Sequence, residues 1–145
     1  MKLSTRVRFG LRIMVQIAAE GIEKPVFSRR IAATQHISEA YVDQILLPLR
    51  TGGLLVSVRG RSGGYRLARP APDISVLDVM RVLEGDLNLV ECVGQPAKCA
   101  RVPICPTRRV WETLTKNIAQ TLRKVTLEEL CKDDARLKAA VDYSI

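Results

Sequence analysis

The stretch that most restricts the fold of this chain is residues 25–69, PVFSRRIAATQHISEAYVDQILLPLRTGGLLVSVRGRSGGYRLAR. It contains two short helical patterns, residues 29–35 and 39–51, which are separated by a tight turn. Two short β-prone runs follow, residues 54–58 and 65–68, and RGRSGG joins them. Helix, turn, helix and a two-stranded wing in this order predict a winged helix-turn-helix, a fold that reads DNA.

The second helical pattern predicts the recognition helix. Ser38 can cap its first turn, as Ser28 can cap the preceding helix, because a serine oxygen accepts a bond from a free backbone N–H. The apolar residues of its expected buried face are Val42, Ile45, Leu46 and Leu49. The other residues near its N-terminus are expected to face outward, where a recognition helix touches base edges.

The turn between the two β-prone runs is rich in glycine and arginine. Glycine permits a positive φ, and Arg59 and Arg61 suit phosphates or a narrow minor groove. A glycine-rich loop can also hold a nucleotide, but RGRSGG lacks the GxxxxGKS/T spacing and leads into a strand. The DNA contacts that we expect are Ser28, Ser38, Glu39, Ala40, Tyr41, Asp43, Gln44, Arg50, Arg59, Gly60, Arg61 and Ser62.

The net charge of +8 lies entirely in the N-terminal half of the chain. Residues 1–72 hold twelve Lys and Arg against four Asp and Glu, whereas residues 73–145 hold eleven of each kind. A basic surface gains affinity for DNA by releasing counterions, although it can also be an ordinary solvated surface. Aromatic residues make up 4% of the chain, which disfavours single-strand binding through stacked bases.

The N-terminus, MKLSTRVRFGLR, lacks the continuous apolar run and the cleavage site of a signal peptide. No window approaches the roughly 18 apolar residues of a membrane span. We therefore expect a cytoplasmic protein with no membrane partner, in which thiols stay reduced.

Apolar residues at spacings of three and four predict helices on both sides of the winged module. The first helix covers residues 2–20, and another follows Ser75. A capping box at Thr126 and Glu129 opens a last helix, whose pattern weakens beyond residue 134.

A long helix is predicted from Thr107 to Val125. Its apolar stripe would be covered either by the first helix or by a second copy of the chain. We favour a homodimer, because symmetric DNA half-sites demand a symmetric protein. The residues expected in the dimer contact are Trp111, Leu114, Ile118, Leu122 and Val125.

The expected fold is mostly α with a small β wing, a winged helix-turn-helix followed by a long C-terminal dimerisation helix. We divide the chain into a DNA-binding domain, residues 1–72, and a second part, residues 73–145, with a cysteine loop and the dimerisation helices. The cysteine loop, residues 86–107, has neither a helical nor a strand pattern, and a loop of this length is usually functional or disordered.

Three of the four cysteines lie in that loop in the pattern C-x6-C-x5-C, as Cys92, Cys99 and Cys105. Thiolates hold iron–sulfur clusters, zinc usually takes CxxC pairs that this loop lacks, and free thiols sense oxidants by forming disulfides. The spacing favours a metal centre over thiols alone. Cys131 is expected to be a buried packing residue. The single histidine, His36, lies in the helix-turn-helix turn, so no side chain is an obvious fourth ligand.

The chain resembles the Rrf2 family of bacterial transcription regulators up to about residue 130. The similar stretches are MKLSTRVRFGLRIM, ISEAYVDQIL, LLVSVRGRSGGYRLARP and ISVLDVMRVLEGD, followed by the cysteine loop; VRGRSGGY is the most specific. This family includes iron–sulfur cluster regulators, nitric-oxide sensors, iron-responsive regulators and cysteine-metabolism regulators.

The resemblance implies a winged helix-turn-helix dimer that binds a palindromic promoter element. It implies DNA contacts at Ser38, Tyr41, Gln44, Arg59 and Arg61. It also implies that Cys92, Cys99 and Cys105 ligate a 2Fe–2S or 4Fe–4S cluster.

Two positions depart from cluster-binding members of the family. Arg108 stands where the cluster-biogenesis regulators have a histidine, three residues after the last cysteine. Arg8 stands where some nitric-oxide sensors have an aspartate ligand.

We therefore expect a DNA-binding transcriptional regulator, a repressor, that senses redox state, iron or nitric oxide through an iron–sulfur cluster in the three-cysteine loop. The alternative is a thiol–disulfide regulator of the same fold without a metal. An enzyme is disfavoured, because the sequence offers neither a Cys–His pair in a plausible cleft nor a phosphate loop. A module that binds protein through its winged helix is a further alternative, against which steeply salt-dependent DNA binding would count.

Overall fold

Helix α1 (Thr5–Glu20) is the element around which the other helices pack in the computed structural model, which describes residues 3–144. Ser4 caps it by accepting a hydrogen bond from the backbone N–H of Val7 at 3.2 Å. Apolar stripes on two sides bury it against the rest of the chain, so that Val7, Ile13 and Ile17 are fully buried. The helix predicted for residues 2–20 is thus confirmed from Thr5 onward, and residue 2 lies outside the described residues.

The helix-turn-helix consists of α2 (Ser28–Gln35) and α3 (Glu39–Thr51). His36 makes the turn between them in the left-handed conformation, with φ of 55°. Ser38 caps α3 as predicted, by accepting a bond from the N–H of Tyr41 at 3.2 Å. The predicted cap of α2 is wrong: Phe27 holds the cap position, and Ser28 is already helical and donates its hydroxyl to Glu39 instead.

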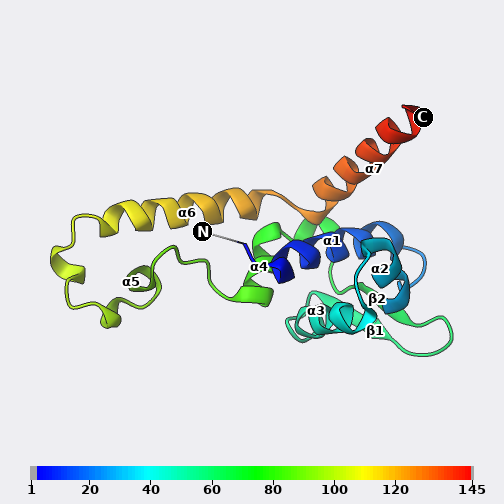
Figure 1. Ribbon diagram of the computed structural model, residues 1–145, viewed down its shortest axis with the longest axis horizontal. Coiled ribbons are helices and arrows are strands. Elements are labelled where there is room, and N and C mark those ends of the chain that lie inside the picture. The colour runs from blue at the N-terminus through cyan, green and yellow to red at the C-terminus, as the bar shows by residue number, and fades with distance from the viewer. Residues whose placement is uncertain (1–2, 145) are drawn as a thin grey trace.

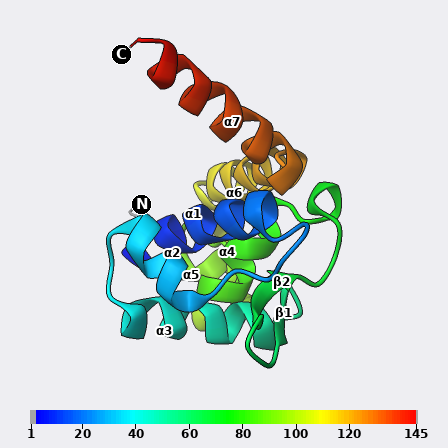
Figure 2. The ribbon, with the colours of Figure 1, turned by 90° about the vertical axis from the view of Figure 1, so that its right-hand side faces the viewer.

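The wing is an antiparallel pair of strands, β1 (Leu55–Val58) and β2 (Gly64–Leu67), in which Leu55 faces Leu67. Val26 adds one further pair to this sheet, because its N–H and carbonyl both bond to Tyr65 at 2.8 Å. The link that precedes α2 is therefore fixed to the wing. Figures 1 and 2 show α3 and the wing on the side of the body away from α7.

Helix α4 (Val76–Glu84) follows a short 3-10 turn, η1 (Ala71–Asp73), and closes the core beneath α1 and α3. Ser75 and Asp78 form the predicted capping box. A Cβ atom on Gly10 of α1 would collide with Leu83, so the two helices approach closely there. One hydrophobic core contains residues of all the helices from α1 through α4, together with Leu127 of α7. The predicted domain division between residues 72 and 73 stays a prediction.

The cysteine loop, residues 86–107, folds into three short helical turns: α5 (Glu91–Gly94), η2 (Pro96–Lys98) and η3 (Val102–Ile104). None of its residues is buried. Helix α6 (Arg108–Lys124) follows, close to the predicted bounds. Figure 1 shows α6 and the cysteine loop extending to one side of the helical body.

Helix α7 (Leu127–Tyr143) begins at the predicted capping box of Thr126 and Glu129. It continues past residue 134, where the apolar pattern weakens, because charged pairs line its exposed turns. Arg136 contacts Asp133 at 2.9 Å and Lys138 contacts Asp134 at 2.6 Å. The predicted fold class, mostly α with a small wing and a long helix near the C-terminus, is confirmed. Within residues 3–144, no helix has the length and apolar character that crossing a membrane requires.

Gly64 is the glycine on which the wing depends, and its replacement by alanine gives a test of the fold. Its φ is 129°, and a Cβ atom there would lie 2.6 Å from the carbonyl oxygen of Val26. We expect Gly64→Ala to lower the free energy of unfolding by about 2 kcal/mol or more, measured by urea denaturation.

Gly60→Ala is the matched control for that substitution. Gly60 also has a positive φ, of 106°, but a Cβ atom there would meet nothing within 4 Å. We expect a loss of only about 1 kcal/mol, from backbone strain alone. Equal losses of unfolding free energy in Gly64→Ala and Gly60→Ala would mean that the close approach of Gly64 to Val26 does not hold the wing.

Candidate nucleic-acid interface and cysteine loop

The N-terminal half of α3 presents the side chains that the sequence predicts to touch DNA. Glu39, Asp43 and Gln44 are exposed, whereas the apolar side of the same helix is buried in the core. Tyr41 is half-buried, and its ring meets Phe9 of α1 edge to face, with centroids 5.9 Å apart and planes at 88°. Edge-to-face aromatic pairs are favourable at this separation, so the contact fixes α3 against α1.

Ser28 and Glu39 tie the starts of α2 and α3 together. The hydroxyl of Ser28 donates to Oε1 of Glu39 at 3.0 Å, and Ser28 is half-buried. The bond holds the Glu39 carboxylate in the first turn of α3, where the helix dipole favours a negative charge. Both residues were predicted to contact DNA, and in this structure they contact each other.

The tip of the wing carries positive charge that no carboxylate neutralises. Arg59, Gly60, Arg61 and Ser62 are all exposed, and within residues 3–144 neither arginine makes an ion pair. Arg50 is likewise exposed, in the last turn of α3. Free guanidinium groups on a protruding turn can reach phosphates or a minor groove.

Of the twelve predicted DNA contacts, ten are exposed, and Ser28 and Tyr41 are half-buried. Their placement is therefore compatible with the prediction, which stays a prediction.

A shallow hollow beside α3 adds residues that sequence reasoning missed. It has a volume of about 490 Å³, and Arg6 of α1 and Leu47 line it together with Tyr41 and Gln44. Leu47 is 56% exposed, although it lies in a helix whose other leucines are buried. No local pattern signals that Arg6 belongs beside α3, because the contact depends on how α1 crosses that helix.

The loop cysteines sit at the ends of its helical turns. Cys92 lies in α5, Cys99 follows η2, Cys105 follows η3, and all three are half-buried. The Sγ atom of Cys105 lies 3.3 Å from the hydroxyl of Thr107. This hydrogen bond, followed by the backbone N–H of Arg108, lowers the pKa of the Cys105 thiol. Cys105 is therefore the loop cysteine for which the structure gives a reason for thiolate character.

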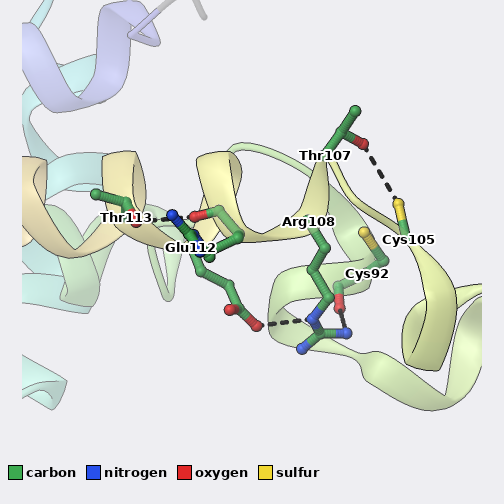
Figure 3. Close-up of polar contacts among 7 residues, drawn as sticks. Cys92, Cys105, Thr107, Arg108, Glu112 and Thr113 are labelled. Atoms are coloured by element: carbon green, nitrogen blue, oxygen red, sulfur yellow. Dashed lines mark hydrogen bonds and ion pairs between the residues drawn. The ribbon is translucent and has the colours of Figure 1, made fainter.

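Arg108 joins the first cysteine to the start of α6 (Figure 3). Its Nη1 donates to the backbone carbonyl of Cys92 at 2.9 Å, and its Nε donates to Oε1 of Glu112 at 2.7 Å. The side chain is only 16% exposed, so these bonds are partly shielded from water. The Arg108 side chain thus attaches Cys92 to the start of α6, next to Cys105, which bonds to Thr107.

The donor chemistry of the loop fits an iron–sulfur cluster, but the arrangement of the donors does not. Three thiols are the right type of ligand for such a cluster. The loop contains no buried residue that would hold it in a single conformation. However, no three His, Cys, Asp or Glu side chains within residues 3–144 are grouped so that they could hold a metal ion. The hydrogen bonds place Cys92 and Cys105 beside the first turn of α6, and within residues 3–144 no hydrogen bond joins Cys99 to either of them.

Cys131 lies apart from the loop, on the side of α7 that faces α1. Its Sγ donates to the carbonyl of Val15 at 3.6 Å, and burial raises the pKa of this thiol. It is half-buried against the core rather than fully buried as predicted. The predicted role as a packing residue agrees with this position.

The predicted dimer stripe of α6 divides into two parts. Leu122 and Val125 pack against the core of their own chain. Trp111 and Leu114, nearer the cysteine loop, are 37% and 41% exposed, and Ile118, about one turn further along the helix, is half-buried. The sequence predicts a dimer contact for all five, and that assignment stays a prediction.

Comparison with known proteins identifies close relatives of the whole chain. The sequence model described as "Rrf2: Iron-dependent Transcriptional regulator" matches residues 3–133. Protein rrf2 of Nitratidesulfovibrio vulgaris is 40% identical over 92% of this chain and 89% of that protein.

Two solved structures are similar at the level of the fold. CymR (YrzC), described as the global cysteine regulator of B. subtilis, superposes with a TM-score of 0.76 at 36% identity and covers 91% of this chain and 97% of that one. IscR of T. potens gives a TM-score of 0.75 at 38% identity and covers 92% and 88%.

The two thiols with shifted pKa values should differ in reactivity. A lowered pKa increases the thiolate fraction at neutral pH and a raised pKa decreases it, so iodoacetamide should modify Cys105 faster than Cys131. Mass spectrometry of metal-free protein at pH 7.5 measures both rates.

Thr107→Val removes the hydrogen-bond partner and should slow the modification of Cys105 without changing that of Cys131. Thr113→Val is the matched control, because the Thr113 hydroxyl bonds to a backbone carbonyl of α6 and not to a thiol. The assignment fails if Cys105 reacts no faster than Cys131 in the unsubstituted protein.

Proposed function

Because the chain belongs to the Rrf2 family of transcriptional regulators, we propose that it represses transcription by binding a palindromic DNA element as a homodimer under control of its cysteine loop. The chain is a DNA-binding regulator of this family, and its relatives CymR of Bacillus subtilis and IscR of Vibrio atlanticus are named as transcriptional regulators and not as enzymes. The expected location in the cytoplasm, where the DNA target and reduced thiols are found, is part of the proposal.

The observation that carries the proposal is the shared exposure of the α3 N-terminus and the wing arginines. Gln44 projects from a helix whose opposite side is anchored in the core, and Arg59 and Arg61 protrude without acidic partners among the described residues. The whole net charge of +8 lies in residues 1–72, which contain both elements. In winged DNA-binding proteins the recognition helix contacts base edges and the basic wing contacts the DNA backbone.

Helix α6 supports the dimer. It has no buried residue within a single chain, although Trp111, Leu114 and Ile118 form an apolar stripe along it. A two-fold contact along this stripe would bury the stripe from both chains. It would also set the spacing of the two recognition helices, which must match half-sites about 34–36 Å apart.

The cysteine loop is the connection through which a signal would reach DNA. It links α4, which belongs to the body that carries α3, to α6, and Arg108 is its polar attachment to α6. A change in the loop would alter how α6 leaves the body and hence the separation of the recognition helices, which shifts the population that is competent to bind.

For the chemistry of the signal, we favour an iron–sulfur cluster held by Cys92, Cys99 and Cys105. Such a cluster, of the 2Fe–2S or 4Fe–4S type, would make the loop responsive to redox state, iron or nitric oxide. The description of the matching family as iron-dependent supports this choice. The thiols would have to be brought closer together than in the present arrangement of the loop.

A thiol–disulfide switch without metal is the second candidate. It is supported by the lowered pKa of Cys105 and by the position of Cys92 and Cys105 at the same end of α6. The similarity to a protein described as a cysteine regulator is compatible with it.

Substitutions on α3 and the wing test the DNA-binding proposal. Arg59→Ala should weaken binding to every duplex alike and lower the slope of log affinity against log salt by about one. Gln44→Ala should cost about 1–3 kcal/mol at selected base pairs and leave nonspecific binding unchanged. Fluorescence anisotropy with operator and scrambled duplexes over a salt series measures both effects.

Lys132→Ala, an exposed position on α7, is the control for loss of one positive charge. A Gln44 variant with unchanged affinity and site preference would remove Gln44 from the contact set. Binding that does not depend on salt in the unsubstituted protein would contradict the assignment of the wing and α3 to DNA.

Absorption spectra and iron and sulfide analysis of protein purified without oxygen distinguish an iron–sulfur cluster from a thiol switch. A cluster predicts visible absorption with matched iron and sulfide per chain, lost in Cys99→Ala and kept in Cys131→Ala. Holo and apo protein should then differ in operator affinity. Colourless protein without iron, even after reconstitution, would eliminate the cluster and leave the thiol switch.

A further inference from the structure

A second pocket lies where the start of the cysteine loop meets α4 and α6. It has a volume of about 390 Å³, and Arg81, Asn88, Thr115, Lys116, Gln120 and Arg123 are among its lining residues. Its walls therefore come from three parts of the chain, and two of them, α4 and α6, are the elements that the cysteine loop connects. We call it the α4–α6 pocket.

The charge of the α4–α6 pocket is positive. Arg81, Lys116 and Arg123 line it, against a single carboxylate, that of Asp86. Asp86 pairs with Arg81 at 3.4 Å, and within residues 3–144 neither Lys116 nor Arg123 has a carboxylate within ion-pair distance. Two cations on one face of a helix, two turns apart, favour an anionic ligand between them.

A buried hydroxyl in the same pocket lacks a partner. The Oγ1 atom of Thr115 is inaccessible to solvent and makes no hydrogen bond. The other two threonines of α6 donate to the backbone carbonyl four residues earlier, Thr113 at 2.8 Å and Thr121 at 3.0 Å. Thr115 does not, although a buried polar group without a partner is costly. Thr115 lines the pocket, so a rotation of its side chain would bring this unused hydroxyl to a ligand oxygen.

The loop side of the pocket is held in place by close packing. Asn88 lines the pocket and lies against Gly94, where an added Cβ atom would collide with the Asn88 amide. Gly94 comes two residues after Cys92. A ligand that contacts Asn88 would therefore also restrain the turn that carries the first loop cysteine.

The pocket faces a different side of α6 from the apolar stripe. Lys116, Gln120 and Arg123 are offset by more than a quarter turn from the centre of the stripe of Trp111, Ile118 and Leu122, at about 100° per residue. A dimer formed along the stripe leaves this side of α6 free.

We propose that the α4–α6 pocket binds a small anion through its carboxylate or phosphate oxygens, with Lys116 and Arg123 as the charged contacts and Thr115 as a hydrogen-bonding contact. The volume is in the range of small-molecule sites. The site does not depend on the DNA-binding proposal or on the chemistry of the cysteines. The α4 wall of the pocket adds Arg81, so an anion bound to these α6 residues lies between α4 and α6, at the junction across which the loop acts.

Calorimetric titration of the full-length protein tests the site, with inorganic phosphate and succinate as separate probes at constant ionic strength in chloride. We expect saturable binding of at least one probe with one site per chain. Lys116→Gln combined with Arg123→Gln should weaken it by about tenfold or more, since each charged hydrogen bond contributes about that factor. Binding of phosphate alone would identify a phosphorylated ligand, and binding of succinate alone a carboxylate.

Three further variants keep the test decisive. Thr115→Val keeps the shape of the side chain and should weaken binding several-fold, whereas Thr113→Val should not. Lys124→Gln removes a neighbouring charge of α6 that does not line the pocket and should leave the affinity unchanged. The proposal is overturned if neither probe binds, or if the Lys116/Arg123 double variant and Thr115→Val bind as tightly as the unsubstituted protein.

Discussion

The burial of α1 is the constraint on which the other parts of this structure depend. The helix presents apolar side chains on two sides, and α2, α3, α4, α7 and the wing all contact it. The close approach of α4 at Gly10 and the aromatic contact between Phe9 and Tyr41 fix the two helices that matter most for function. A recognition helix can bind base edges specifically only if its position is fixed. The packing of α1 therefore fixes the position that α3 needs for this role.

The cysteine loop is built on the opposite principle. Residues 86–107 contain no buried residue, only Leu87 among them packs against the core, and the Arg108 guanidinium of α6 bonds to the backbone carbonyl of Cys92. Segments with few buried apolar contacts open at low free-energy cost, and elements that move in regulation come from such segments. The α4–α6 pocket lies at this boundary between a rigid body and a loosely held loop.

The sequence predicted the features whose signals are local. The caps at Ser38, Ser75 and Thr126 are short patterns that fix their own geometry, and the strands of the wing are defined by the glycines between them. Features that depend on contacts between distant residues could not be predicted. Ser28 bonds to Glu39, eleven residues away, instead of capping its own helix. Arg108 contacts Cys92 across the whole loop. The unpartnered hydroxyl of Thr115 becomes visible only when α6 is placed against α4.

The absence of buried residues from the described cysteine loop also bears on how proteins of this type diverge. Substitutions in a segment without buried residues cost little folding free energy. Metal-ligating side chains can therefore be gained, lost or respaced there without unfolding the winged helix-turn-helix. In this chain the residue that follows the loop, Arg108, supplies an attachment to the Cys92 carbonyl. The same DNA-binding helices can in this way be combined with different sensing chemistries in the loop. The DNA-binding architecture is then retained while the chemistry of the signal changes.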